Sequence, residues 1–342
     1  MKKRWLLFVL LTLLLTACGG NDNVVNVYNW GEYIDTEVLR QFEDETGITV
    51  VYDTFVTNED MYVKMKNDSS QFDVVIPSDY MIDRMIKEDM VQPLDASKIP
   101  NREKVNTEFF SDMTFDADGT YSVPYMWGTL GIVYDKTKVS PTPTSWDVLW
   151  DPQYEGRIVM MDSVRDTLGI ALVRLGYSMN ARDEAQLEEA KNTLIEQKPL
   201  VYAYRLDETK DMMVQSESDL AVMYSGDAYV ALSGNENLEY VVPEEGSNLW
   251  IDGMVITKDA KNVDNAHAFI NFMTRPDIAA KNAEYIGYSI PIPEGVALLP
   301  EEMRNSHVAY PENLEAMQLE VFNDPSDILE VYDRIWTDII SH

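Results

Sequence analysis

Apolar and polar residues alternate in blocks that predict short strands and amphipathic helices over the first third of the chain. Residues 24–28 are β-branched and aromatic, which is typical of a buried strand, and the turn former Asn29 would end it. Val38 and Phe42 then lie on one face of a helix that Gly47 would stop. The predicted strands continue with 48–55 and 72–76, and the predicted helices are 36–46, 60–66 and one that begins at Asp79. This β-α-β-α-β order indicates a mainly parallel sheet.

Residues 121–135 form a long β-rich run, interrupted at Pro124 and Gly128, which is typical of a chain that crosses between two lobes. A second group of elements is expected after it, with strands at 158–162, 220–224, 240–243 and 253–257 and helices at 167–175, 184–195, 263–274, 276–285 and 327–340, and from Ala228 onward. Trp250 and Asp252 are expected in the segment that joins the last two strands. The predicted fold is α/β with two lobes, one formed by 24–128 and 252–300 and the other by 129–251 and 301–342.

The amino terminus has the pattern of an export signal. Lys2, Lys3 and Arg4 precede an apolar run over 5–15, which is too short to span a bilayer because a spanning helix needs about 20 apolar residues. Residues 15–18, Leu-Thr-Ala-Cys, resemble the lipobox of bacterial lipoproteins, in which the cysteine is lipidated and becomes the new amino terminus. We therefore expect a signal peptide at 1–17, a lipidated Cys18 and a tether at 18–23. Cys18 is the only cysteine, so no intramolecular disulfide is possible. A free thiol is the alternative.

The charge balance is strongly acidic and changes the expected partners. The chain has 59 acidic and 27 basic residues, and loss of the signal peptide moves the formal charge from −32 to −35 because three basic residues leave with it. The electric field of so negative a protein repels nucleic acid and anionic lipid headgroups and attracts cations. We therefore expect no nucleic-acid partner. Acidity that only keeps an exported protein soluble is the alternative. Disorder is excluded by 45% hydrophobic and 11% aromatic residues.

Carboxylates and aromatic rings occur together at predicted strand ends, and this recurrence is the main chemical signal. The groups are Trp30, Glu32 and Tyr33; Asp79 and Tyr80; Tyr224 and Asp227; and Trp250 and Asp252. Asp166 lies near a further strand end without a ring beside it. Aromatic faces attract cations and pack on methylenes, while buried carboxylates accept charged N–H groups. The combination suits an organic cation with several amines on a hydrocarbon chain. Core rings and helix N-terminal charges are the alternative interpretation.

Enzymatic motifs are missing from the sequence. It contains no G-x-S-x-G elbow, phosphate-binding loop or dinucleotide fingerprint. His267 has no second histidine one helical turn away, so a zinc site is not expected. We predict no catalytic residue, no cofactor and no metal. Paired carboxylates with aromatic platforms also occur in glycosidases, which leaves a glycosidase as the enzymatic alternative.

Six segments resemble the spermidine/putrescine-binding proteins of polyamine ABC transporters, in the same order and over nearly the whole mature chain. They are residues 28–33, 45–48, 75–78, 124–128, 250–252 and 286–288. The resemblance implies a two-lobed, type II periplasmic-binding-protein-like fold with the ligand in a hinged cleft between the lobes. It also places ligand-lining residues at Trp30, Tyr33, Ser78, Tyr80, Tyr224, Trp250, Asp252 and Tyr288, with Glu32 beside them and Asp166 holding an amine.

Four positions depart from the family pattern. Asp166 stands where the spermidine branch usually has glutamate, and Ser163 stands where that branch often has an aspartate that holds an amine. Tyr224 replaces a common tryptophan, and Phe322 replaces a glutamine. These differences leave the choice between spermidine and putrescine open.

The resemblance implies a monomeric receptor, anchored by its lipid to the outer face of the cell membrane, that delivers a polyamine to an ABC permease and its ATPase. An oligosaccharide-binding receptor is the alternative within the binding proteins, and an adhesive surface protein is a further one.

Overall fold

The computed structural model describes residues 23–106 and 115–342 of the chain. The predicted signal peptide and residues 18–22 of the predicted tether, with Cys18, lie outside the described residues. Within the described residues, ten strands join in the order β2-β1-β3-β9-β4-β7-β5-β6, with β10 beside β9 and β8 beside β4. The strands are β1 Val24–Trp30, β2 Thr49–Phe55, β3 Val74–Val75, β4 Ser122–Asp135, β5 Ile158–Met161, β6 Val201–Arg205, β7 Leu220–Tyr224, β8 Leu238–Val241, β9 Ser247–Ile256 and β10 Leu319–Glu320.

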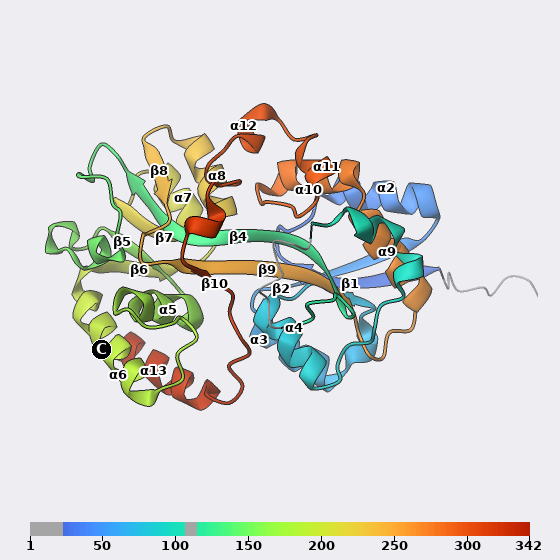
Figure 1. Cartoon of the computed structure of the whole chain (residues 1–342), viewed down its shortest axis with the longest axis horizontal. Coiled ribbons are helices and arrows are strands. Elements are labelled where there is room, and N and C mark those ends of the chain that lie inside the picture. Colours follow the sequence, from blue (N-terminus) through green and yellow to red (C-terminus); the bar gives the residue numbers. More distant parts are fainter. Residues whose placement is uncertain (1–22, 107–114) are drawn as a thin grey trace, which may run out of the picture.

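Two long strands, β4 and β9, cross the middle of the molecule and connect two α/β lobes (Figure 1). The first half of β4 pairs antiparallel with β9, and its second half, from Leu130, pairs with β7 and β8. The predicted crossing run is therefore confirmed. The predicted interruption is wrong, because β4 is continuous and only its register shifts between Pro124 and Met126. Gly128 lies within the strand. Only glycine fits there, because a Cβ would lie 2.5 Å from the Trp250 ring.

Each lobe contains a parallel group of strands covered by helices. β1 pairs in parallel with β2 and β3 in one lobe, and β5 pairs in parallel with β6 and β7 in the other. The α/β, two-lobed fold class is confirmed, and the residue boundaries of the lobes stay a prediction. The helices are α2 Thr36–Thr46, α3 Asn58–Asn67, α4 Asp79–Lys87, α5 Val164–Arg174, α6 Glu184–Gln197, α7 Glu208–Val214, α8 Ser225–Gly234, α9 Val263–Met273, α10 Pro276–Ile286, α11 Pro293–Val296, α12 Glu301–Arg304 and α13 Leu329–Ser341.

Helix α2 has the bounds that the sequence predicts, and its end groups explain why. Asp35 precedes it and accepts the backbone N–H of Glu37 at 2.8 Å, which satisfies one of the free donors of the first turn. Gly47 follows with a φ of 70°, in the left-handed region where glycine has no steric cost. Local capping signals therefore set the bounds of this helix, and Val38 and Phe42 pack its apolar face into the core.

Two predicted boundaries near the crossing strands are wrong. β9 begins at Ser247, so Trp250 and Asp252 lie inside a buried strand and not in a joining segment. The strand extends that far because β4 pairs with it on one side, and Ser78 forms a β-bridge with Asp252 on the other. Helix α8 begins at Ser225, three residues before the predicted start, since β7 leads into it without a loop.

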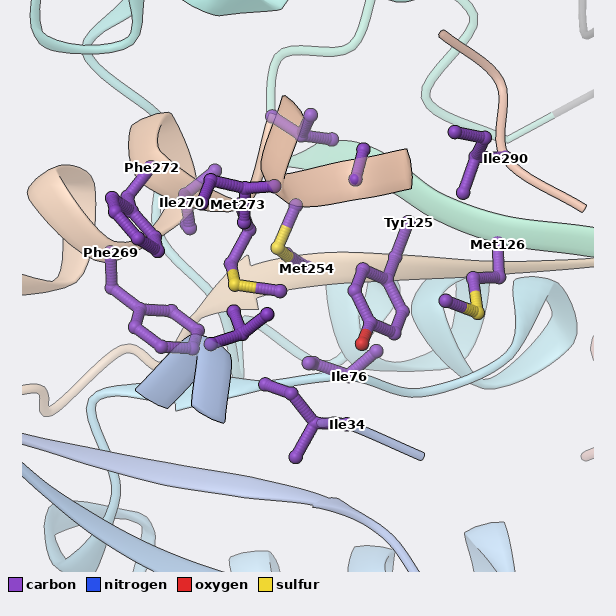
Figure 2. Packing of buried hydrophobic residues seen from close by; sticks show 14 of the residues in the cluster. Ile34, Ile76, Tyr125, Met126, Met254, Phe269, Ile270, Phe272, Met273 and Ile290 are labelled. Carbon is purple, nitrogen blue, oxygen red and sulfur yellow. The ribbon is translucent and has the colours of Figure 1, made fainter. Parts of the chain in front are cut away.

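The core of the first lobe packs against the crossing strands β4 and β9. Figure 2 shows Tyr125 and Met126 of β4 and Met254 of β9 in one buried cluster with Phe269 and Met273 of α9. Tyr33 and Trp250 belong to the same cluster, so the candidate binding residues are continuous with the core. Among the described residues, no helix is both long and apolar enough to cross a bilayer.

Candidate binding site

Asp252 is a buried carboxylate with one engaged and one free oxygen. Its Oδ2 accepts the phenol O–H of Tyr33 at 2.7 Å, whereas its Oδ1 has no hydrogen-bond partner in the described part of the chain. Burial raises the pKa of Asp252 to about 6, although hydrogen bonds from Ser78 and Tyr33 lower it. Only 5% of the residue is exposed. A buried acceptor with a free oxygen is suited to a cationic N–H donor.

Four aromatic rings form a continuous chain beside Asp252. Tyr33 and Tyr288 lie edge to face with centroids 5.5 Å apart, and Tyr288 and Trp250 are 5.2 Å apart. Trp250 and Tyr224 continue the chain at 5.8 Å. Tyr33 follows β1 and Tyr224 ends β7, so the chain runs from one lobe to the other. The walls of the predicted cleft therefore touch one another in this structure.

Tyr288 contacts the start of α8 closely. A Cβ on Gly226 would lie 1.6 Å from Cδ1 of Tyr288, so only glycine fits beneath the ring. The phenol of Tyr288 donates to Oδ2 of Asp227 at 2.8 Å, and the other oxygen of Asp227 lies 3.6 Å from Nζ of Lys210. Asp227 therefore holds Tyr288 against the opposite lobe.

Asp166 lies in the first turn of α5 and is buried. Its Oδ2 accepts the hydroxyls of Ser163 at 2.6 Å and of Tyr224 at 2.9 Å. Burial raises the pKa of Asp166, and these two hydrogen bonds lower it. Ser163 therefore has two roles, because it also caps the helix that carries Asp166.

Tyr80 and Arg165 meet where the two lobes adjoin. The guanidinium carbon of Arg165 lies 5.8 Å from the Tyr80 ring centroid and 4.3 Å from that of Phe322. Arg165 is buried and donates to the phenol of Tyr332 at 3.1 Å. Phe322 therefore packs against a buried cation by a cation–π contact.

Asp79, the first residue of α4, ties this helix to β9. One carboxylate oxygen accepts the backbone N–H of Tyr80 at 2.6 Å, and the other accepts that of Ile251 at 3.1 Å. Burial raises the pKa of Asp79 well above its ordinary range, and the charge of Asp252 raises it further. Asp79 thus fixes the backbone between Trp250 and Asp252.

Trp30 and Glu32 lie farther out than the residues above. Trp30 ends β1, is half-buried and packs against Phe55 with ring centroids 4.6 Å apart. Glu32 is exposed, with a φ of 52°. Its charge raises the pKa of Asp207, after the larger effect of burial and against the charge of Lys210. Glu32 therefore lies at the rim, whereas the other predicted residues are buried or half-buried.

Sequence reasoning missed the residues that hold the predicted ones in place. Tyr125 donates its phenol to the backbone oxygen of Tyr33 at 2.7 Å, and Asn58 contacts both Ser78 and Tyr80. Tyr125 lay in a predicted strand and Asn58 lay just before a predicted helix. Tyr125 lies in one of the segments that resemble the family, but neither position indicated these contacts, because each acts through residues distant in the sequence.

Comparisons with known proteins agree with this architecture. The family model described as bacterial extracellular solute-binding protein matches residues 37–311. The spermidine/putrescine-binding periplasmic protein of Salmonella typhimurium is 37% identical over 329 residues, which cover 95% of this chain and 94% of that protein.

Two solved structures extend the match to three dimensions. The spermidine/putrescine ABC transporter substrate-binding protein PotD of Streptococcus pneumoniae is 45% identical, with a TM-score of 0.82 and coverage of 93% of this chain and 99% of that one. The TpPotD lipoprotein of Treponema pallidum is 28% identical, with a TM-score of 0.85 and coverage of 92% and 99%. The resemblance of the six sequence segments is thereby confirmed. The chain belongs to the bacterial extracellular solute-binding proteins, in their spermidine/putrescine-binding family.

Proposed function

We propose that this protein captures a polyamine, spermidine or putrescine, between its lobes and delivers it to an ABC permease driven by a separate ATPase. The observation that carries the proposal is Asp252, whose free carboxylate oxygen is buried beside a chain of four aromatic rings. A protonated amine supplies the missing donor, and its methylenes pack on the ring faces. The names of the relatives support the same ligand class.

Each proposed residue has a separate role in binding. Asp252 and Asp166 accept amines, Glu32 makes the rim negative, and Ser78 supports Asp252. The aromatic side chains that line the methylene chain are Trp30, Tyr33, Tyr80, Tyr224, Trp250 and Tyr288. Each charge-assisted hydrogen bond contributes about 1.5 to 3 kcal/mol and each cation–π contact about 0.5 to 2 kcal/mol. A few of each reach micromolar affinity, about 8 kcal/mol, after the costs of ordering.

Entry of the ligand requires the two walls to separate. Tyr288 of the first lobe contacts Trp250 and Gly226 of the second, so an amine can reach Asp252 only in a more open arrangement. The crossing strands β4 and β9 are the natural hinge, because they are the long connections shared by both lobes. Closure would then bury the ligand against residues from each side.

We further propose that residues 1–17 are removed, that Cys18 is lipidated, and that the monomeric protein is held on the outer face of the cell membrane. The lipobox pattern supports this location. The Treponema relative is named as a lipoprotein, and the Salmonella relative is named as periplasmic.

Isothermal titration calorimetry of the mature chain with spermidine, putrescine and a neutral oligosaccharide tests the ligand class. We expect one or both amines to bind and the sugar to produce no heat. Amine binding should weaken as salt rises, while sugar binding would be insensitive to salt. Binding of the sugar without either amine would overturn the proposal, and turnover of a glycoside would favour a glycosidase.

A further inference from the structure

Asn58 links two candidate binding residues although it is not one of them. It is the first residue of α3, and 4% of it is exposed. Its side-chain oxygen accepts the backbone N–H of Ser78 at 3.2 Å, and its side-chain nitrogen donates to the phenol oxygen of Tyr80 at 3.0 Å. Both ends of one buried amide are therefore bonded to the segment that lies beside Asp252.

Helix α3 does not need this amide for its own stability. The N-cap is Thr57, whose side chain accepts the backbone N–H of Asp60 at 3.1 Å. The side chain of Asn58 points its hydrogen bonds away from α3 instead. A buried amide that serves another segment is expected to fix that segment's position, because leaving either partner unbonded is costly.

The bond to Tyr80 determines how the phenol is oriented. Because its oxygen accepts from Asn58, its proton is free to be donated, and it bonds Oε1 of Glu59 at 3.0 Å. The two bonds come from adjacent residues of α3 and hold the hydroxyl end of the ring. The ring face is then kept near Arg165 and the opposite lobe.

The hydrogen bond from Ser78 to Asn58 also affects Asp252. Ser78 forms an antiparallel β-bridge with Asp252, and its proximity to the carboxylate lowers the pKa of Asp252. Displacement of Ser78 would therefore weaken an interaction that favours the charged form. Asn58 thus acts on both the ring and the carboxylate although it is itself buried.

We propose that Asn58 is a positioning residue that pre-organises Tyr80 and Ser78 for binding of an amine. The inference rests on the proposed function. Pre-organised contacts improve affinity because less ordering is needed when the ligand arrives. Loss of the amide should consequently lower the affinity for the amine more than it lowers the stability of the folded protein.

The test is a double-mutant cycle of Asn58→Ala and Tyr80→Phe, measured by calorimetry with spermidine and putrescine. We expect Asn58→Ala to weaken the tighter-binding amine about tenfold, as loss of a hydrogen bond does. In the Tyr80→Phe background the same change should cost at least threefold less, because the partner hydroxyl is already absent. Additive effects, or an unchanged affinity, would overturn the role of Asn58.

Further variants separate positioning from folding. Asn58→Leu replaces the alanine variant if that variant folds poorly. Leucine keeps about the volume of asparagine without its hydrogen bonds, and it should cause the same loss of affinity. Asn101→Ala is the matched control. The Asn101 amide donates to the backbone oxygen of Asn271 at 2.9 Å, and this hydrogen bond lies away from the proposed site. The substitution should lower the unfolding temperature without changing affinity.

If the wild-type protein binds neither amine, the proposed function fails and this inference fails with it. An additive cycle with wild-type binding intact overturns only Asn58.

Discussion

The phenol of Tyr33 donates a 2.7 Å hydrogen bond to Asp252, 219 residues later in the chain. This bond stabilises the charged carboxylate, whereas burial opposes the charge, and burial prevails because the pKa of Asp252 is raised to about 6. A carboxylate that titrates near neutral pH at the centre of a cation site makes both binding and stability depend on pH.

Amine affinity should fall as the pH drops through 6. Protonation of Asp252 removes its charge while the amines stay protonated, so the dissociation constant should rise up to tenfold per pH unit below about 6 and be constant above about 7. Calorimetry between pH 4.5 and 8 measures the profile. Tyr33→Phe removes a bond that lowers the pKa, so its midpoint should lie at higher pH. An identical midpoint in the variant would contradict this assignment.

Asp252→Asn should abolish tight amine binding and stabilise the ligand-free protein. Since the folded-state pKa is raised, the folded state binds the proton more tightly than the unfolded state, and stability is lost as the pH rises from about 4 through 6. A shift of about two units corresponds to at most about 3 kcal/mol at pH 7. Urea unfolding without ligand measures it, and at pH 4 the two proteins should differ little. Destabilisation at pH 7 would show that the charge is compensated in the folded protein.

The sequence identified the candidate binding residues but not the contacts between them. Tyr33 and Asp252 each stand beside a second ring or carboxylate, which is a local signal. Their hydrogen bond depends on the position of β9 between β3 and β4, and no local pattern encodes that register. Trp250 and Asp252 were expected in the segment that joins two strands, ahead of a strand beginning at Gly253. Pairing with β4 on one side and the bridge to Ser78 on the other make them part of β9 instead.

The helix that carries Asp227 illustrates a second limit. Ser225 and Gly226 resemble a turn in the sequence, yet they form the first turn of α8. Tyr288 from the other lobe lies over Gly226, and its phenol bonds Asp227. The absence of a side chain at Gly226 therefore serves a contact between lobes, which the local sequence cannot reveal.

Gly226→Ala should weaken amine binding by more than tenfold without destabilising the ligand-free protein. The added Cβ would lie 1.6 Å from Tyr288, so the ring must move away from Asp227. Alanine is favoured over glycine within a helix, and this preference offsets the lost contacts. Calorimetry and thermal unfolding separate the two effects. Gly31→Ala is the control, because its Cβ would meet no atom within 4 Å. Equal affinities of wild type and Gly226→Ala would exclude this contact from closure.

Ser163→Ala should weaken binding of both amines. Ser163 caps α5 and donates to Oδ2 of Asp166 at 2.6 Å. Loss of the cap costs about 1 kcal/mol of stability. The pKa of Asp166, which burial raises, should also rise further without this hydrogen bond, so less of the carboxylate is charged. Calorimetry across the acidic range and at pH 8 should show the larger loss of affinity at the lower pH. A loss of stability with no change in affinity would limit Ser163 to capping.

Ser163→Asp should shift the preference toward spermidine. Aspartate is also a good N-cap, so α5 should keep its start. The new carboxylate would lie beside Asp166, and the two negative charges repel unless a cation lies between them. Spermidine has a third amine to place there, whereas putrescine has only two, both of which Asp252 and Asp166 already engage in the proposed mode. We therefore expect the ratio of the putrescine to the spermidine dissociation constant to rise about tenfold, the effect of one added charge-assisted hydrogen bond. Parallel calorimetry of wild type and variant with both amines measures the ratio, and an unchanged ratio would mean that the third amine binds elsewhere.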